Sequence, residues 1–218
     1  DSNVWVSGLG DFVTMNSTSH ADGFQYNGGG YAAGIDYAWM KKFRAGIAFG
    51  QTFGTFKSDD NQASIKQDSI MTGLYANYLE TLCDKQSVGL RGYFSYGSVE
   101  NRADTLIGNS SYLPGHAKWN DDVFFFGLKA DWNIKVTDKA TLTPFIGIDY
   151  VHGAQESFTK TYDNGSRQYR DGNMQVWSVP VGITVKKEVS VGGGQLLLPE
   201  LTLAYVGDIS RTNPSVKS

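Results

Sequence analysis

Six side chains in the sequence could take part in acid–base chemistry, because histidines and carboxylates are common proton carriers in hydrolytic sites. They stand in or beside the polar stretches between the apolar ones: His20, Asp22, Asp59, Asp60, His116 and His152. A hydrolytic site needs such groups within hydrogen-bond reach of one another, and spacing along a chain does not establish that reach. Because solvated loops are rich in polar residues anyway, a hydrolytic site is the weaker hypothesis.

Metal binding and covalent catalysis find less support. Residues 58–62 (SDDNQ) are acidic, but they lack the glycine and the terminal glutamate of a calcium-binding EF-hand loop. Cys83 is the only cysteine and falls in a short polar turn, where nothing indicates the neighbouring base that a nucleophile needs. We therefore predict no metal ion, no cofactor and no catalytic residue, and we expect that the protein is not an enzyme.

The elements that would position these groups are short segments in which apolar residues alternate with small or polar ones. In residues 31–39, for example, Tyr31, Ile35 and Trp39 share one parity, while Gly34 and Asp36 share the other. Such a period of two is typical of a β-strand with two different faces. About nine segments follow this pattern: 4–13, 31–39, 44–53, 70–78, 88–96, 124–133, 145–151, 177–185 and 200–205.

The length and polarity of these segments favour a membrane barrel over a soluble sandwich. Each covers roughly 9–11 residues, which is what a tilted strand needs to cross a bilayer, whereas soluble strands have a mode near 5–6 residues. A charge that faces lipid near the midplane costs about 2–4 kcal/mol, so the charges on the polar row are predicted to face a lumen. These lumen-facing candidates are Asp36, Arg44, Arg91, Lys129, Asp131, Asp149 and Glu200.

Large aromatic residues and the connections indicate two membrane interfaces. Trp39, Tyr78 and Trp132 are predicted to form a belt near the short turns, and Phe53, Tyr96, Tyr150, Trp177 and Tyr205 a belt near the long loops. Short links are expected at 41–42, 80–85, 137–139 and 188–194, and they alternate strictly with long loops at 15–28, 58–64, 101–119 and 152–172. Outer-membrane barrels have this asymmetry, with short periplasmic turns and long outer loops.

Composition excludes several other classes. A net charge of −3 with 19% charged residues fits neither a disordered chain nor a basic nucleic-acid-binding protein. No run of about 18 apolar residues exists that could form a transmembrane helix, and the mean hydropathy is −0.31. The 26 glycines and 12 tyrosines are explained by small lumen-facing positions and interfacial aromatics. The predicted fold is an all-β, antiparallel, up-and-down transmembrane barrel of the outer-membrane type.

Seven short motifs resemble, in order along the chain, the successive strands of autotransporter β-domains, the translocators of type V secretion. They are VWVSGLG (4–10), GFQYNGGG (23–30), AGIDY (33–37), GIAFG (46–50), GLYANY (73–78), TPFIGIDY (143–150) and PELTLAY (199–205). Each motif alone is weak, but their order over the whole chain is fairly specific. The resemblance implies a barrel of twelve strands whose pore holds a helix that leads to an exported upstream passenger.

The chain departs from that family pattern in two ways. Only about nine strands can be counted, without the terminal strand and its closing aromatic residue, and no helix precedes Val4. We expect residues 1–218 to be one translocator module that ends before its C-terminal strands. An open edge cannot persist in lipid, so this segment alone should not insert stably.

The resulting hypothesis is a bacterial outer-membrane barrel that translocates and anchors an N-terminal passenger at the cell surface. Its expected partners are outer-membrane lipid, its own passenger and pore helix, and the barrel-assembly machinery, with no nucleic acid and a monomeric state. The lumen charges either pair with one another or grip the pore helix. The alternatives are a non-secreting diffusion channel, a barrel with a hydrolytic site at its outer rim, and a soluble β-protein such as a lectin-like sandwich.

Overall fold

The computed structural model describes residues 1–16, 23–39, 42–58, 63–105, 115–163, 165–192 and 195–212. All regular structure in these ranges is β-strand. Nine long strands form the main sheet: β1 (Ser2–Met15), β2 (Phe24–Trp39), β3 (Phe43–Ser58), β4 (Ala63–Cys83), β5 (Gln86–Thr105), β6 (Gly115–Thr137), β7 (Ala140–Gln155), β10 (Gly172–Lys187) and β13 (Glu200–Thr212). Four short strands complete the set: β8 (Phe158–Tyr162), β9 (Gly165–Tyr169), β11 (Val189–Gly192) and β12 (Gln195–Leu197).

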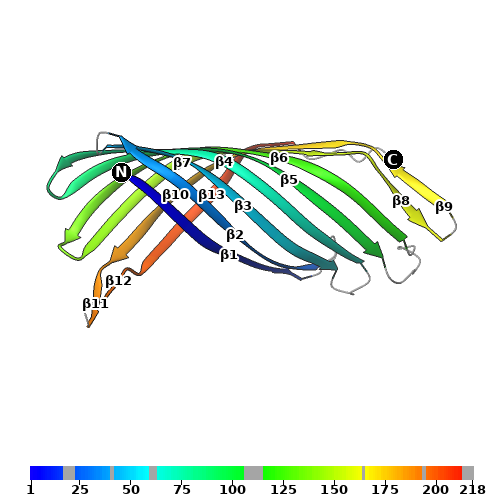
Figure 1. The fold of residues 1–218 in the computed structure, drawn as a ribbon, viewed down its shortest axis with the longest axis horizontal. Helices are drawn as coiled ribbons and strands as arrows, with labels where there is room; N and C mark the ends of the chain where they lie inside the picture. Colours follow the sequence, from blue (N-terminus) through cyan, green and yellow to red (C-terminus); the bar gives the residue numbers. More distant parts are fainter. Residues whose placement is uncertain are drawn as a thin grey trace.

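The topology is antiparallel and up-and-down, as the sequence predicted. Each long strand pairs with the next one, in the order β1-β2-β3-β4-β5-β6-β7-β10-β13. The sheet arches over a concave space, with β1 and β13 as its two edges (Figure 1). Among the described residues these two edges do not pair with each other, so the sheet stays open. No helix in the described ranges is long and apolar enough to cross a membrane.

The strands are longer than the predicted rows of roughly 9–11 residues, which is a correction. β4 contains 21 residues, β5 contains 20 and β6 contains 23. At about 3.3 Å per residue, β6 extends about 75 Å, well beyond a hydrocarbon core of about 30 Å even with a strong tilt. The pattern marked only the part of each strand in which one row is apolar, whereas backbone pairing continues into polar sequence.

The connections also differ from the strict alternation of short and long links. Most of the loops expected at 101–119 and 152–172 is strand, because β5 and β6 continue outward and β8 and β9 prolong β7 and β10. Only residues 59–62 separate β3 from β4, so that predicted long loop is short. The link predicted at 188–194 instead holds the β11–β12 hairpin. The turns at 84–85 and 138–139 are short, as predicted.

The sheet therefore has two different ends, which we name by their connections. The turn end carries the short turns and the β11–β12 hairpin, and the loop end carries β8 and β9 (Figure 1). β8 pairs with β6 through Gly115 and His116, so it continues the sheet beyond the end of β7. Strands β5, β6, β8 and β9 reach farthest at the loop end (Figure 1).

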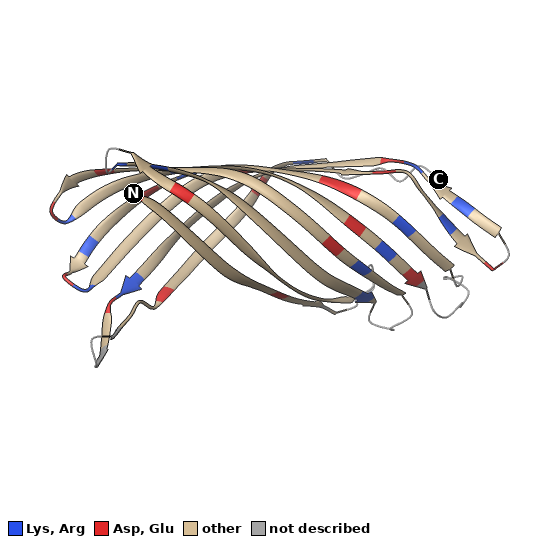
Figure 2. Cartoon of the chain, viewed as in Figure 1, with Lys and Arg blue, Asp and Glu red and all other residues tan. Residues whose placement is uncertain are grey.

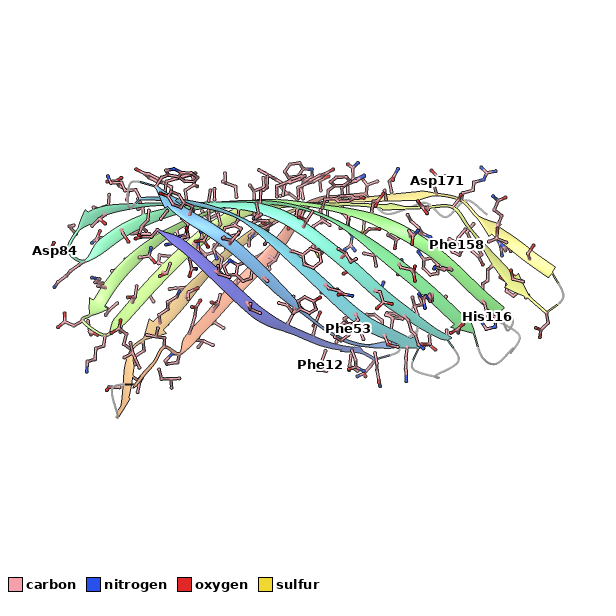
Figure 3. All side chains as sticks on the ribbon, in the orientation of Figure 1. Phe12, Phe53, Asp84, His116, Phe158 and Asp171 are labelled. Atoms are coloured by element: carbon pink, nitrogen blue, oxygen red, sulfur yellow. The ribbon has the colours of Figure 1, made fainter. Side chains whose placement is uncertain are left out.

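Contacts between strands that are not neighbours distinguish the two faces of the arch. Trp5 Nε1 on β1 donates a hydrogen bond of 2.7 Å to Tyr75 Oη on β4, and Tyr93 Oη on β5 donates one of 2.8 Å to Asp149 Oδ1 on β7. Both contacts lie on the concave face, because curvature draws its side chains together. Apolar side chains cover the convex face, where Ile47 is 56% exposed and Leu74 59% (Figure 3).

Candidate functional site on the concave face

Two adjacent rows of polar residues cross the concave face near the turn end. The first, which we call the cation row, contains Arg44, Asn77, Arg91 and Lys129, each paired in register with the next. The second, which we call the tyrosine row, lies two residues farther along each strand. It contains Asp36, Gly46, Tyr75, Tyr93, Gly127 and Asp149. Because side chains two residues apart share a face, the two rows form one polar surface.

Asp36 is held on β2 by groups from three other strands. Its carboxylate accepts hydrogen bonds from Arg44 and, at 2.7 Å, from Tyr75 Oη. Tyr75 Oη in turn accepts the bond from Trp5 already described. The side chain of Asp36 is only 5% exposed, whereas that of Arg44 is 38% exposed. The carboxylate therefore lies against the wall and the guanidinium lies above it.

Asp131 on β6 repeats this arrangement with Arg91 on β5. Its Oδ2 accepts two hydrogen bonds from Arg91, at 2.8 Å from Nε and 2.6 Å from the terminal nitrogen. Its Oδ1 accepts a bond of 3.1 Å from Asn133, which also accepts one of 2.9 Å from Thr143. Asp131 is 4% exposed and Arg91 is 48% exposed. A buried carboxylate depends on its ion-pair partner, so a substitution that removes only one member of this pair should strongly destabilise the fold.

The other three lumen candidates also lie on the concave face. The Lys129 ammonium lies 3.4 Å from the centroid of the Phe145 ring, a cation–π geometry. Asp149 accepts the hydrogen bond from Tyr93. Glu200, at the start of β13, forms an ion pair of 2.9 Å with Lys186 on β10. Among the described residues, then, five of the seven candidates belong to ion pairs and two have a single aromatic neighbour.

Glycines make room for the large rings on this face. A Cβ on Gly127 would overlap the ring of Tyr93, and one on Gly34 would overlap the indole of Trp5. Each glycine lies directly across from the aromatic residue on the neighbouring strand. The ring can therefore lie flat on the sheet and reach across it, which explains part of the high glycine content.

The convex face carries a continuous series of rings toward the loop end. Tyr96 and Phe124 have centroids 4.9 Å apart, Phe124 and His152 6.1 Å, and Tyr150 and Trp177 4.5 Å. Tyr150 also stacks on His152 at 6.5 Å, so the series runs from β5 to β10. This is the arrangement expected of an aromatic belt at a membrane interface.

The remaining belt candidates are more dispersed. Trp39 contacts Tyr37 and Phe43, and Tyr78 pairs with Phe43 and donates to Glu80 at the turn end. Trp132 is exposed on the same face of β6. Tyr205 pairs with Val181, whereas Trp177 pairs with Ser210, so Tyr205 lies farther from the loop end than the other candidates of its belt.

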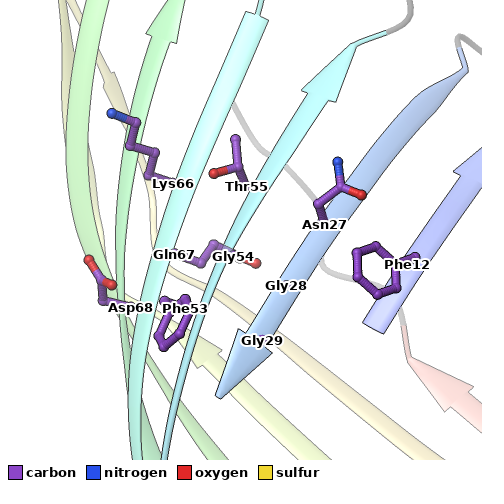
Figure 4. Close-up of a pocket in the computed structure, with 10 residues that line it drawn as sticks. All are labelled: Phe12, Asn27, Gly28, Gly29, Phe53, Gly54, Thr55, Lys66, Gln67 and Asp68. Atoms are coloured by element: carbon purple, nitrogen blue, oxygen red, sulfur yellow. The ribbon is translucent and has the colours of Figure 1, made fainter. Parts of the chain in front are cut away.

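Phe53 lies where the apolar convex surface becomes polar. It borders a shallow depression with Phe12, and the floor between the two rings is formed by Gly29 (Figure 4). Asn27, Thr55 and Lys66 line the same depression toward the loop end, and Asp68 lies directly across from Phe53. Polar side chains thus begin at the level of Phe53, as they do beyond the ring series on β5 and β6.

The predicted acid–base residues do not form one site in the described part of the chain. His116 and His152 lie on strands rather than in loops: His116 Nδ1 is 2.6 Å from Asp104 Oδ1, while His152 belongs to the convex ring series. His20, Asp22, Asp59 and Asp60 lie outside the described residues. In the described ranges no group of three His, Cys, Asp or Glu side chains could hold a metal ion.

Charged residues beyond the ring series pair on the outer parts of β5 and β6 (Figure 2). Glu100 accepts hydrogen bonds from Lys118, at 2.8 Å, and from Arg102. These bonds hold the pKa of the Glu100 carboxyl below its ordinary value, and the bond from Lys118 has the larger effect. Ion pairs of this kind suit a surface in water and contrast with the apolar rows nearer the turn end.

Comparison with known proteins places this sheet in a family. The family model described as "Autotransporter beta-domain" matches residues 4–218. The chain belongs to the autotransporter β-domain family. This β-domain is 27% identical over 224 residues to "Probable outer membrane protein pmp21" of Chlamydia pneumoniae, covering 97% of the chain and 13% of the relative. It is 26% identical over 228 residues to "Probable outer membrane protein PmpB" of Chlamydia trachomatis, covering 99% of the chain and 13% of that relative.

A solved structure has the same fold. The β-domain superposes on the translocator domain of the autotransporter NalP from Neisseria meningitidis with a TM-score of 0.72, at 18% sequence identity, over 99% of this chain and 72% of that one. The family, the antiparallel up-and-down topology and the outer-membrane location expected from the sequence are thereby confirmed. The β-domain spans only a small part of the curated relatives' length, 13% of each of these two.

Sequence reasoning missed the aromatic partners of the site. Trp5, Tyr75, Tyr93 and Phe145 lie among the polar groups of the concave face, but no role was predicted for them. The sequence did contain a signal: Tyr75 and Tyr93 fall on the polar row, each across from a glycine, Gly46 or Gly127. A large ring opposite a glycine on the polar parity indicates a side chain that lies along the inner wall.

Proposed function

We propose that this β-domain forms part of an outer-membrane barrel that exports an upstream passenger segment and then anchors it at the cell surface. The observation that carries the proposal is the inverted polarity of the sheet in a chain of the autotransporter β-domain family: charges line the concave face and apolar rows the convex face. In a soluble sandwich the apolar rows would pack inward instead.

Each face has a matching partner in this proposal. The convex rows face lipid, with the ring series at the outer interface and the residues around Trp39 and Tyr78 at the inner one. The concave face lines a pore filled by water, by a helix or by a passing unfolded segment. Strands outside this chain complete the barrel, since β1 and β13 need partners in lipid. The cell's barrel-assembly machinery inserts it, and the closed barrel is a monomer that binds no nucleic acid.

No catalytic step is part of the proposal. Translocation requires a polar conduit and a lipid-compatible exterior, and the concave clusters supply hydrogen-bond donors and acceptors for such a conduit. Anchoring follows once the barrel is embedded, because the polar interior and apolar exterior are both satisfied only across a bilayer.

Protease shaving of intact cells that express the complete parent protein tests the proposal. The region upstream of Asp1 and the barrel in the outer-membrane fraction are probed separately. We expect a large upstream segment to be removed while a membrane-embedded barrel fragment survives. An embedded barrel without any exported segment would instead establish a diffusion channel, and recovery of the intact protein in a soluble fraction would overturn both.

A further inference from the structure

The arginines and aspartates of the concave face differ sharply in exposure. Asp36 and Asp131 are 5% and 4% exposed, whereas their partners Arg44 and Arg91 are 38% and 48% exposed. Each of these two pairs is balanced in charge, yet the concave space meets mainly its cationic member. The third ion pair of this face, Lys186–Glu200, has both members exposed, at 56% and 49%. Each buried carboxylate holds its arginine at the wall, because an arginine that moved away would leave a buried charge without its ion-pair partner.

The arginines keep donors available after pairing. A guanidinium carries several N–H groups arranged as a planar fork. Arg91 uses two of them on Asp131, and Arg44 uses one on Asp36. The rest of each exposed group lies toward the concave space, where it matches a carboxylate or a carbonyl oxygen.

Register places these cations at one level of the wall. Arg44, Arg91 and Lys129 belong to the same row, with Asn77 between the arginines, so they form a band across β3 to β6. The concave curvature brings Lys186 of β10 to the same recess, which is also lined by Arg44, Asn77 and Arg91. A chain that passes through the pore near the turn end meets this band on the side of entry.

We propose that the cation row binds acidic residues of the segment that occupies the pore, so that the barrel favours an acidic segment over a basic one of equal length. This inference rests on the proposed translocation function and adds the charge of the preferred occupant. The complementary groups are the carboxylates of the exported chain. A pore whose charged pairs merely filled the wall would treat acidic and basic segments alike.

The test uses the complete parent protein with a short reporter segment placed at one site in its passenger. Three reporters of equal length carry aspartates, lysines or serines, and their arrival at the cell surface is followed by pulse-chase and protease accessibility. We expect the acidic reporter to appear about threefold faster than the basic one, the scale of an exposed pair interaction. The serine reporter should fall between them.

The decisive variant removes the charges and keeps the hydrogen-bonding shapes. It combines Asp36→Asn with Arg44→Gln and Asp131→Asn with Arg91→Gln, so no buried carboxylate loses its partner. The ratio of acidic to basic rates should fall toward one. The matched control, Glu100→Gln with Lys118→Gln, removes an ion pair on the convex outer surface and should leave the ratio unchanged.

Three outcomes have separate meanings. An unchanged ratio in the neutral variant, with its barrel assembled, would overturn the inference and leave translocation intact. Failure of every reporter to reach the surface, despite an assembled barrel, would instead overturn the translocation function. If the neutral variant does not assemble, Lys129→Gln decides, since Lys129 forms a cation–π contact with Phe145 and no ion pair within 4 Å among the described residues. A reduced ratio of acidic to basic rates supports the inference, and an unchanged ratio overturns it.

Discussion

The concave and convex faces of this sheet are built from the same strands, yet they hold their side chains in different ways. On the concave face, polar groups reach across intervening strands, as from Trp5 to Tyr75 and from Tyr93 to Asp149. On the convex face, the ring series joins neighbouring strands only, and the apolar rows nearer the turn end stand exposed. Side chains of the protein satisfy the polar groups of the concave face, whereas lipid surrounds the apolar side chains of the convex face.

This difference explains how an alternating sequence can specify a membrane protein with almost no apolar core. Within the described residues only Ala117 and Phe145 are buried hydrophobic side chains. The buried side chains are mostly polar, and they include Asp36, Asp131, Asn101 and Thr143. At the loop end the same principle continues, where Asn101 accepts from Gln67 and donates to Asp121. Polar packing on one face replaces the hydrophobic core.

The largest expected effect comes from placing a charge on the wrong face. Leu128→Arg puts a guanidinium on the convex face of β6 and should destabilise the complete barrel by about 2–4 kcal/mol, the cost of a cation in lipid. Ser95→Arg, on the concave face of β5, should cost less than about 1 kcal/mol. Urea unfolding of the full parent protein in lipid vesicles measures both. Equal costs would mean that the two faces have the same environment.

The next effect tests the glycines under the concave rings. Gly127→Ala forces the ring of Tyr93 off the wall and should cost about 1–3 kcal/mol, the usual range for overpacking. Gly92 lies on the convex face, where an added Cβ would be 3.6 Å from Leu128, an ordinary contact, so Gly92→Ala serves as the control. The same unfolding assay compares them, and a larger loss at Gly92 would contradict the assignment of the faces.

A smaller effect is expected in the ring series. Trp177→Ala removes the contact with Tyr150 at 4.5 Å and should destabilise the barrel by about 1 kcal/mol more than Trp132→Ala does. Trp132 is a suitable reference because it lies on the same face, and in the described ranges no ring contact involves it. If both substitutions lower the free energy of unfolding in vesicles by the same amount, the contact between the rings contributes no stability beyond burial of the tryptophan in lipid.

The smallest effect concerns pH and the outer extension. The pKa of Glu100 is below its ordinary value, because Lys118 and then Arg102 donate to the ionised carboxylate. A lowered pKa means that the stabilisation is present above the unfolded value of 4.5 and is lost as the pH falls through the lower folded value. The protection of backbone amides along β5 and β6 against hydrogen exchange, relative to their intrinsic rates, should therefore fall locally below that pH. Glu100→Gln should remove this pH-dependent loss of protection, and its persistence would assign it to another group.

Local pattern predicted much of the fold. The period of two located all nine long strands, because every strand has one row against lipid and one against polar groups. It underestimated β4, β5 and β6, since their outer parts lie beyond the bilayer and carry polar residues on both faces. It also misplaced His116 and His152 in loops, because their polar character gives no sign of backbone pairing.

Parity groups the charged candidates on one face of the strands, and their lumen-facing role stays a prediction. The seven charged candidates share the polar row, and the structure places all of them on the concave face. Their partners could not be read from the sequence: which arginine meets which aspartate depends on register between strands, and Trp5 meets Tyr75 only because the sheet is bent.

The sequence by itself determined which residues share a face, how many long strands form and which family the chain resembles, because alternation is a local property of each strand. Only the tertiary structure decided which charges are buried and which are presented. Arg91 is exposed and Asp131 buried because of the neighbours that register and curvature bring to each of them. That asymmetry, rather than the count of charges, leaves the arginines of the cation row as the exposed members of their pairs.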